Sequence, residues 1–259
     1  MKRVVLIDSP VANVANIARA LETAGAALTL ARDPDAVRNA EKVVLPGVGS
    51  FQAAMEWLDA SGIGDALREF RGMLLGICVG HQVLFESSEE GLGPRCSGLG
   101  VLAGAVTRLA TALPVPQIGW NRVAFGDTPL FEGIENETPF YFVNSYVVAD
   151  APDEIAAADY GTRFTAAVQR GNVFGVQFHP EKSSRAGLQV LRNFVNFGGR
   201  VSSPAPHEGA GEDTRAPKGS VFCESFRRSI FSTGRSCGCV AATLATGLST
   251  AIPMSCWTR

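Results

Sequence analysis

A cysteine flanked by two glycines is the residue of this chain best placed for covalent chemistry. The apolar stretch Met73-Leu74-Leu75-Gly76-Ile77 leads into Cys78-Val79-Gly80, and a helix-compatible segment follows. The pattern Gly-x-Cys-x-Gly is typical of a nucleophile elbow, a strand-to-helix turn too tight for side chains at −2 and +2. Such a turn lifts the thiol above the sheet, and the helix that begins there favours the thiolate. The alternative is a buried structural cysteine beside an ordinary turn, because short motifs also match by chance.

A cysteine nucleophile needs a base, and the base needs a third group that holds it. The chain has three histidines, of which His207 lies in the C-terminal tail and can be set aside. His81 follows Cys78 by three residues on the predicted helix, which carries it away from the thiol and makes it a packing residue. His179 follows a predicted strand and is the better base by elimination. Glu181, two residues on, is placed to orient the imidazole, although most glutamates are solvated surface charges.

A carbonyl attacked by the sulfur also needs donors for the oxyanion that forms. The amide of Val79 is one candidate, and Gly47-Val48-Gly49 could bring a second amide close because glycines permit backbone approach. An ordinary strand-to-helix turn would explain the same glycines. In the main body no His/Cys cluster has the spacing of metal ligands, and the chain has neither a P-loop nor Gly-x-Gly-x-x-Gly. We therefore expect no metal and no cofactor.

Alternating strand and helix patterns in the first half predict how these residues are positioned. The predicted strands cover residues 3–7, 27–30, 43–45 and 73–77, and helical patterns separate them. This alternation indicates a parallel sheet with helices on both faces, in which sites form beyond the carboxyl ends of the strands. After Gly91 short strands at 105–109, 140–143, 166–169 and 173–176 predict a more antiparallel flank of the same domain, and an amphipathic helix around 188–195 closes it.

Composition limits the class of protein. The 259 residues carry a formal charge of −2 and a pI near 6.0, so we expect neither nucleic acid nor an anionic membrane as a partner. Of six cysteines, four lie in the last 37 residues, which is no disulfide framework and suits a reducing cytoplasm. The continuously apolar stretch near the N-terminus, residues 4–7, is too short for a signal-peptide core.

The sequence divides at about residue 199 into a folded domain, 1–199, and a low-complexity tail, 200–259. Residues 202–220 are rich in Ser, Pro, Gly and charge, which predicts disorder. Residues 237–257 are apolar but rich in small residues, and a membrane span needs roughly 20 strongly apolar ones. We interpret this tail as read-through or frame-shifted sequence.

Three ordered motifs resemble the signatures of class I glutamine amidotransferases. They are Pro46-Gly47-Val48-Gly49-Ser50-Phe51, Gly76-Ile77-Cys78-Val79-Gly80-His81-Gln82 and Gly175-Val176-Gln177-Phe178-His179-Pro180-Glu181. Four further stretches resemble the glutaminase subunits of imidazole glycerol phosphate synthase in particular. They are Phe85-Glu86-Ser87-Ser88-Glu89-Glu90-Gly91, Gly119-Trp120-Asn121, Phe140-Tyr141-Phe142-Val143 and His179-Pro180-Glu181-Lys182-Ser183. The resemblance covers about residues 1–199.

The resemblance implies a flavodoxin-like α/β sandwich that hydrolyses glutamine to glutamate and ammonia. Its triad would be Cys78, His179 and Glu181, acting through a glutamyl thioester, and the residues around bound glutamine would be Gln82, Glu90, Ser145 and Tyr146. The implied partner is a separate cyclase subunit, a (β/α)8 barrel, in a heterodimer. That subunit would use the ammonia to make imidazole glycerol phosphate and an aminoimidazole carboxamide ribotide in histidine biosynthesis.

The chain departs from the family pattern at four places. Ser9-Pro10-Val11-Ala12-Asn13 replaces a Tyr-Gly-x-Gly-Asn turn, Gln117 and Asn144 stand where histidine is frequent, and His81 stands where this subfamily usually has methionine. Two alternatives follow. One is another class I glutaminase subunit, serving anthranilate, guanylate or pyridoxal phosphate synthesis, against which Gly119-Trp120-Asn121 and Lys182-Ser183 argue. The other is a catalytically silent partner subunit, which the altered turn and the two lost histidines suggest.

Overall fold

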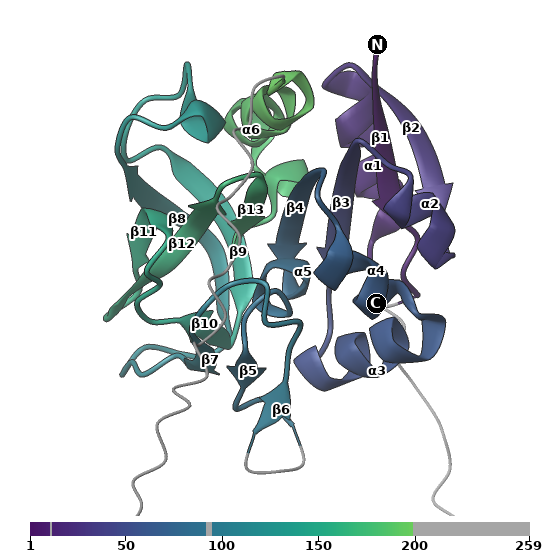
Figure 1. The fold of residues 1–259 in the computed structure, drawn as a ribbon. Coiled ribbons are helices and arrows are strands. Elements are labelled where there is room, and N and C mark those ends of the chain that lie inside the picture. The colour runs from purple at the N-terminus through teal and green to yellow at the C-terminus, as the bar shows by residue number, and fades with distance from the viewer. Residues whose placement is uncertain (11, 92–94, 199–259) are drawn as a thin grey trace, which may run out of the picture. The chain divides into compact units, whose positions relative to one another are not determined.

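A mixed sheet runs through the molecule in the computed structural model, which describes residues 1–10, 12–91 and 95–198 (Figure 1). Five neighbouring strands of the sheet are parallel. In spatial order these are β2 (Ala26–Ala31), β1 (Lys2–Ile7), β3 (Lys42–Gly47), β4 (Met73–Cys78) and β13 (Val173–Val176). Both β3 and β4 are buried along their whole length, as expected of parallel strands covered on both faces.

The rest of the sheet is largely antiparallel, as the glycine- and proline-punctuated second half predicts. Beyond β13 the strand order continues through β12 (Arg163–Arg170), β10 (Tyr146–Val148), β7 (Ala105–Arg108), β5 (Ser87–Ser88) and β6 (Cys96–Ser97). A branch leaves β12 through β11 (Glu154–Asp159), β8 (Gln117–Phe125) and β9 (Pro139–Asn144). Five strands were not predicted: β5, β6 and β10 are only two or three residues long, β11 is rich in alanine, and polar residues and a glycine interrupt β8.

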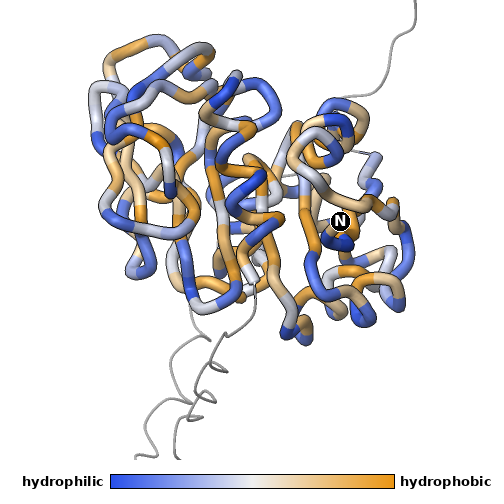
Figure 2. Tube along the Cα trace, turned by 90° about the horizontal axis from the view of Figure 1, so that it is seen from above, coloured by the Kyte–Doolittle hydropathy of each residue, from blue (hydrophilic) through white to orange (hydrophobic). Residues whose placement is uncertain are grey.

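Two groups of helices pack on the sheet. One consists of α1 (Val14–Thr23) and α6 (Ser184–Asn196), and the other of α2 (Pro34–Arg38), α3 (Phe51–Ser61) and α4 (Ile63–Glu69). The short helices are α5 (Val79–Gln82), η1 (Pro129–Phe131) and η2 (Pro180–Lys182). Figure 2 shows apolar stretches along the central strands and hydrophilic residues interspersed along the outer segments.

The carboxyl ends of the central parallel strands meet at one edge of the sheet. Gly47, the last residue of β3, is in register with Cys78, the last residue of β4. On the other side of β4, Val176 at the end of β13 is in register with Ile77. The loops that leave β3, β4 and β13 therefore begin side by side (Figure 1), which brings three segments distant in sequence to one place.

At the opposite edge a buried lysine holds the end of α6. The Nζ of Lys42 donates hydrogen bonds to the carbonyl oxygens of Phe194, at 3.1 Å, and Val195, at 2.6 Å, and to that of Phe197. Burial, together with the charge of Lys2, lowers the pKa of Lys42 to about 8. These bonds supply partners for carbonyl groups that the end of a helix leaves open.

Residues 199–259, which include His207, lie outside the described residues. What was predicted for the tail and for His207 therefore stays a prediction. Among the residues that the structure does describe, no helix combines the length and the apolarity that crossing a bilayer requires.

His81 lies in the core and not in the site, as predicted for a packing residue. Its ring is fully buried and meets Phe85 edge-on at a centroid distance of 5.1 Å. Neither ring nitrogen has a hydrogen-bond partner among the described residues. Gly175 makes room for the ring, because a Cβ there would collide with its Nδ1. Burial lowers the pKa of His81 to about 3, so the imidazole is neutral in the folded protein at ordinary pH.

We expect His81→Met to stabilise the protein by roughly 1–2 kcal/mol at pH 7, since it removes two unpartnered buried polar atoms. The difference should grow in acid. Unfolded histidine has a pKa near 6.5, so the unfolded state gains a proton as the pH falls through that value, whereas buried His81 does not. The wild type should lose roughly 2 kcal/mol more than the variant between pH 7 and pH 5. Urea unfolding at both pH values measures this, and equal losses would contradict it.

Candidate functional site

The strand-to-helix turn at Cys78 has a strained backbone. Cys78 has φ 55° and ψ −112°, a positive φ that side chains other than glycine rarely adopt. Such conformations persist only where the surroundings impose them, and they cluster at functional sites. The sulfur is nearly buried, and the thiol is free.

Three glycines impose this turn by lacking a side chain. A Cβ at Gly76 would come within 2.6 Å of the carbonyl oxygen of Gly80, and one at Gly80 would collide with the carbonyl oxygen of Leu45. These are the −2 and +2 positions that the elbow pattern predicts. Gly47 is a third such position, because a Cβ there would lie 2.5 Å from the Gly80 amide nitrogen. The sequence suggested a site role for Gly47, and the structure places it beneath the turn.

The helix after Cys78 is too short to favour the thiolate in the way that the sequence predicted. Helix α5 spans only four residues, Val79–Gln82. A single turn aligns few peptide dipoles, so the helix contributes little to the stability of a thiolate. Stabilisation of the anion must come from side chains around the sulfur.

His179 and Glu181 form a buried pair beyond the end of β13. Nδ1 of His179 lies 2.9 Å from Oε1 of Glu181, and the two side chains are 3% and 1% exposed. Backbone bonds hold the loop: the amide of His179 donates to the carbonyl of Tyr141 at 2.8 Å. The hydroxyl of Ser183 donates to the carbonyl of His179 at 2.7 Å and accepts from the amide of Tyr141 at 3.0 Å. The imidazole is thus fixed, with Nε2 left to exchange a proton.

The charges around His179 favour its protonated form. Burial alone lowers the pKa of His179, but its interactions with Cys78 and Glu181 outweigh burial and raise the pKa to about 9. At neutral pH His179 is therefore an imidazolium that interacts with Cys78 on one side and with Glu181 on the other. A thiolate is the nucleophilic form of cysteine.

The sulfur of Cys78 also has two neighbours that sequence reasoning did not identify. The backbone carbonyl of Val143 lies 3.9 Å from it on one side, and Nε2 of Gln177 lies 3.9 Å from it on another. The available signal was that Gln177 is the one polar residue of the apolar run Gly175-Val176-Gln177-Phe178.

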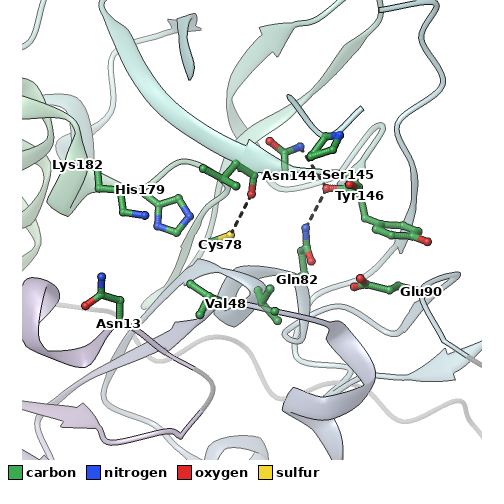
Figure 3. A pocket seen from close by; sticks show the side chains of 14 residues that line it. Asn13, Val48, Cys78, Gln82, Glu90, Asn144, Ser145, Tyr146, His179 and Lys182 are labelled. Atoms are coloured by element: carbon green, nitrogen blue, oxygen red, sulfur yellow. Dashed lines mark hydrogen bonds between the residues drawn. The ribbon is translucent and has the colours of Figure 1, made fainter. Parts of the chain in front are cut away.

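A cavity of about 450 Å³ opens beside the sulfur. The predicted residues that line it with Cys78 and His179 are Val48, Gly49, Val79, Gln82, Glu90, Ser145 and Tyr146, so the fold brings all of the predicted site together except Glu181, behind the imidazole, and Gly47. Figure 3 shows Cys78 between His179 and Lys182 on one side and Gln82, Glu90 and Tyr146 on the other. Asn13, Pro116, Val143, Asn144 and Lys182 line the cavity too, and were not predicted.

Two of the polar lining side chains are held in place by the backbone. Nε2 of Gln82 donates to the carbonyl of Tyr146 at 2.9 Å, and Oε2 of Glu90 accepts from the amide of Phe51 at 2.8 Å. The site can therefore offer a fixed carboxylate and a fixed side-chain amide to a small polar molecule whose reactive end reaches the sulfur.

The two departures Gln117 and Asn144 are cross-strand partners on β8 and β9. Both side chains are buried, and Oε1 of Gln117 and Oδ1 of Asn144 have no hydrogen-bond partner among the described residues. Asn144 lines the cavity and Gln117 does not, and two uncharged amides thus stand at positions where histidine is frequent in the family.

Comparison with known families and proteins finds relatives that match most of this chain. The family described as glutamine amidotransferase class-I matches residues 5–197. The imidazole glycerol phosphate synthase subunit HisH of Moorella thermoacetica is 45% identical over 200 residues, covering 75% of this chain and 94% of that protein. The subunit of the same name from Symbiobacterium thermophilum is 46% identical over 202 residues, covering 75% and 93%.

Solved structures share the fold. A crystal structure of a glutamine amidotransferase matches with a TM-score of 0.58 at 22% identity, covering 74% of this chain and 96% of that one. The structure of PurLQS from Thermotoga maritima matches with a TM-score of 0.56 at 20% identity, covering 76% and 99%. These matches confirm the predicted class I amidotransferase sandwich.

We expect iodoacetamide to alkylate Cys78 readily at pH 7, because His179 stays protonated up to about pH 9 and interacts with the sulfur. His179→Gln should slow the reaction at pH 7 by about tenfold or more, since a neutral amide no longer stabilises the thiolate. Site-resolved mass spectrometry measures both rates.

Cys96 is an internal control for this experiment. Burial, followed by the nearby Glu56 and Asp59, raises the pKa of Cys96, so its alkylation should need alkaline pH and should not change in the variant. Equal rates at Cys78 in the two proteins would show that His179 does not act on the sulfur.

Proposed function

The chain belongs to the class I glutamine amidotransferase family, and on that premise we propose that it is the glutaminase subunit of an imidazole glycerol phosphate synthase. The observation that carries the proposal is the strained Cys78 beside His179, whose other ring nitrogen is 2.9 Å from Glu181. The free thiol of Cys78 must stay reduced, which suits a cytoplasmic enzyme.

In the first half of the reaction the Cys78 thiolate attacks the side-chain carboxamide carbon of glutamine. The carbonyl oxygen becomes an oxyanion, and we assign its stabilisation to the backbone N–H of Val79 and to amides of the Gly47-Val48-Gly49 turn. Gly49 has φ +87°, which a larger residue would resist. His179 then donates its proton to the nitrogen, the C–N bond breaks, and ammonia leaves a glutamyl thioester.

In the second half His179 accepts a proton from water, and the hydroxide attacks the thioester carbon. The C–S bond breaks, glutamate is released, and the thiolate–imidazolium pair is restored. Glu181 is the positioning group throughout, because its bond to Nδ1 holds Nε2 toward the sulfur. We place the amino acid end of glutamine against Glu90, Gln82, Ser145 and Tyr146, where the Glu90 carboxylate suits an ammonium group.

An exposed apolar patch beside the cavity supports docking of a partner. Ile118 and Trp120 on β8 are 64% and 54% exposed, and Trp120 meets Tyr141 of β9 edge-on at 6.0 Å. The Nζ of Lys182, a cavity residue, lies 5.8 Å from the centre of the Tyr141 ring. We propose that this patch binds the cyclase subunit, a (β/α)8 barrel, so that ammonia passes to it without release into water. Protonated ammonia has no lone pair with which to attack.

Cys78→Ala should abolish imidazole glycerol phosphate synthesis from glutamine in the complex with the cyclase, yet leave synthesis from added ammonium salts unchanged. The thiol is needed only to liberate ammonia, so external ammonia bypasses it. Glutamate release and product formation, measured with the cyclase and its nucleotide substrate, give both rates. Loss of the two syntheses together would mean that the cysteine is structural.

The wild type in the same assay separates the alternatives. Glutamate release that rises sharply on addition of the cyclase supports the proposal. Rapid glutamate release that does not change when the cyclase is added would leave the proposed cysteine chemistry intact and indicate another class I pathway. Absent release in a complex that still forms would support the catalytically silent subunit.

Trp120→Ala should weaken binding of the cyclase by about tenfold or more, because exposed aromatic residues are frequent anchors of interfaces. Leu30→Ala on β2 is a matched control: it is 53% exposed and lies in the outermost strand of the parallel half. Calorimetric titration of each variant with the cyclase measures the affinity. A similar loss in both variants would rule out the patch as the docking site.

A further inference from the structure

We propose that Gln177 is a further residue of the catalytic site, whose side-chain amide donates to the sulfur of Cys78 and stabilises the thiolate. The inference rests on the proposed function in one respect, that Cys78 is the nucleophile. Gln177 immediately follows β13 and precedes the His179 loop, and its side chain is fully buried. Its backbone amide donates to the carbonyl of Ala166 at 2.9 Å, which fixes the residue on the neighbouring strand β12.

Gln82 determines which way the Gln177 amide faces. Nε2 of Gln82 donates to Oε1 of Gln177 at 2.9 Å in a fully buried contact, and the same nitrogen donates to the carbonyl of Tyr146 at 2.9 Å. Rotating the Gln177 amide by half a turn would set two NH₂ groups against each other. The NH₂ group of Gln177 is therefore directed at the sulfur, 3.9 Å away.

The sulfur has a suitable partner in each of its protonation states. As a thiol it can donate to the carbonyl of Val143, and as a thiolate it can only accept, which makes Gln177 its neutral donor. A hydrogen bond to a charged group is stronger than one between neutral groups. Gln177 therefore favours transfer of the thiol proton to His179.

The other ionisable groups near the sulfur lie elsewhere in the site. His179 carries the transferred proton, and Glu181 lies behind its ring. Glu90, Lys182 and Tyr146 are in the cavity wall. Removing Gln177 leaves all of these in place, so an effect on the sulfur can be attributed to the lost donor.

A donor at this position assists both halves of the reaction. The thiolate is the attacking group in the first half and the leaving group when the thioester breaks in the second. Gln82, which lines the cavity proposed for glutamine, donates a hydrogen bond to Gln177 and so holds its amide toward the sulfur. Loss of Gln177 should lower kcat more than it raises KM.

The test is the pH dependence of Cys78 alkylation by iodoacetamide in the full-length protein. In Gln177→Met the rate at pH 7 should fall about tenfold and recover at higher pH, because the thiolate loses its neutral donor. Gln177→Glu keeps the shape and the bond from Gln82 but directs a carboxylate oxygen at the sulfur, so its rate at pH 7 should be lower still. Should Gln177→Met not fold, Gln177→Glu carries the test.

Gln117→Met is the matched control, since Gln117 is a buried glutamine on β8 whose Oε1 has no hydrogen-bond partner among the described residues. Its alkylation profile should equal that of the wild type. A folded Gln177→Met with a wild-type profile, or a Gln177→Glu that reacts as fast as the wild type at pH 7, would overturn the inference.

Alkylation requires no glutamine, so this inference and the proposed function fail separately. A wild type that releases no glutamate with the cyclase, while the Gln177 variants show the expected alkylation shifts, would refute the function and leave Gln177 as the donor. Normal glutamate release together with unchanged alkylation in Gln177→Met would refute the donor and leave the function.

Discussion

The contact between the ends of β3 and β4 without intervening side chains determines the rest of the site. Gly47, Gly76 and Gly80 allow the turn after β4 to lie against the end of β3, and Cys78 takes a positive φ as a consequence. Sheet register then places the end of β13 beside this turn. One backbone constraint thus fixes the sulfur relative to the oxyanion amides, the base and the cavity.

The charged groups of this site are buried, and they are also paired with one another. His179 and Glu181 are nearly inaccessible to water, and an isolated charge in such a place would be costly. Arranged as thiolate, imidazolium and carboxylate, the three groups neutralise one another in part, and Gln177 adds a donor without adding charge. His81 shows the contrasting case: it is as deeply buried, has no partner among the described residues, and therefore stays neutral.

Sequence patterns predicted the parallel half of the fold because its buried strands are continuous apolar runs. They predicted the elbow because few residues other than glycine fit the −2 and +2 positions. They did not predict β8, whose residues Gly119, Asn121 and Arg122 break the apolar alternation. Sequence patterns could not predict the contact of Gln177 with the sulfur either, because it depends on the register of β13 with β4 and on the orientation of an amide.

The bonds of Lys42 indicate where another group can be attached to the folded domain. Its bonds to Phe194, Val195 and Phe197 hold the end of α6 against the start of β3, whereas Cys78 is in register with the last residue of that strand. A strand of six residues separates the two edges by about 17 Å. Residue 198 is therefore a point where a surface linker or a reporter dye can be attached to the folded domain with the mouth of the cavity left clear.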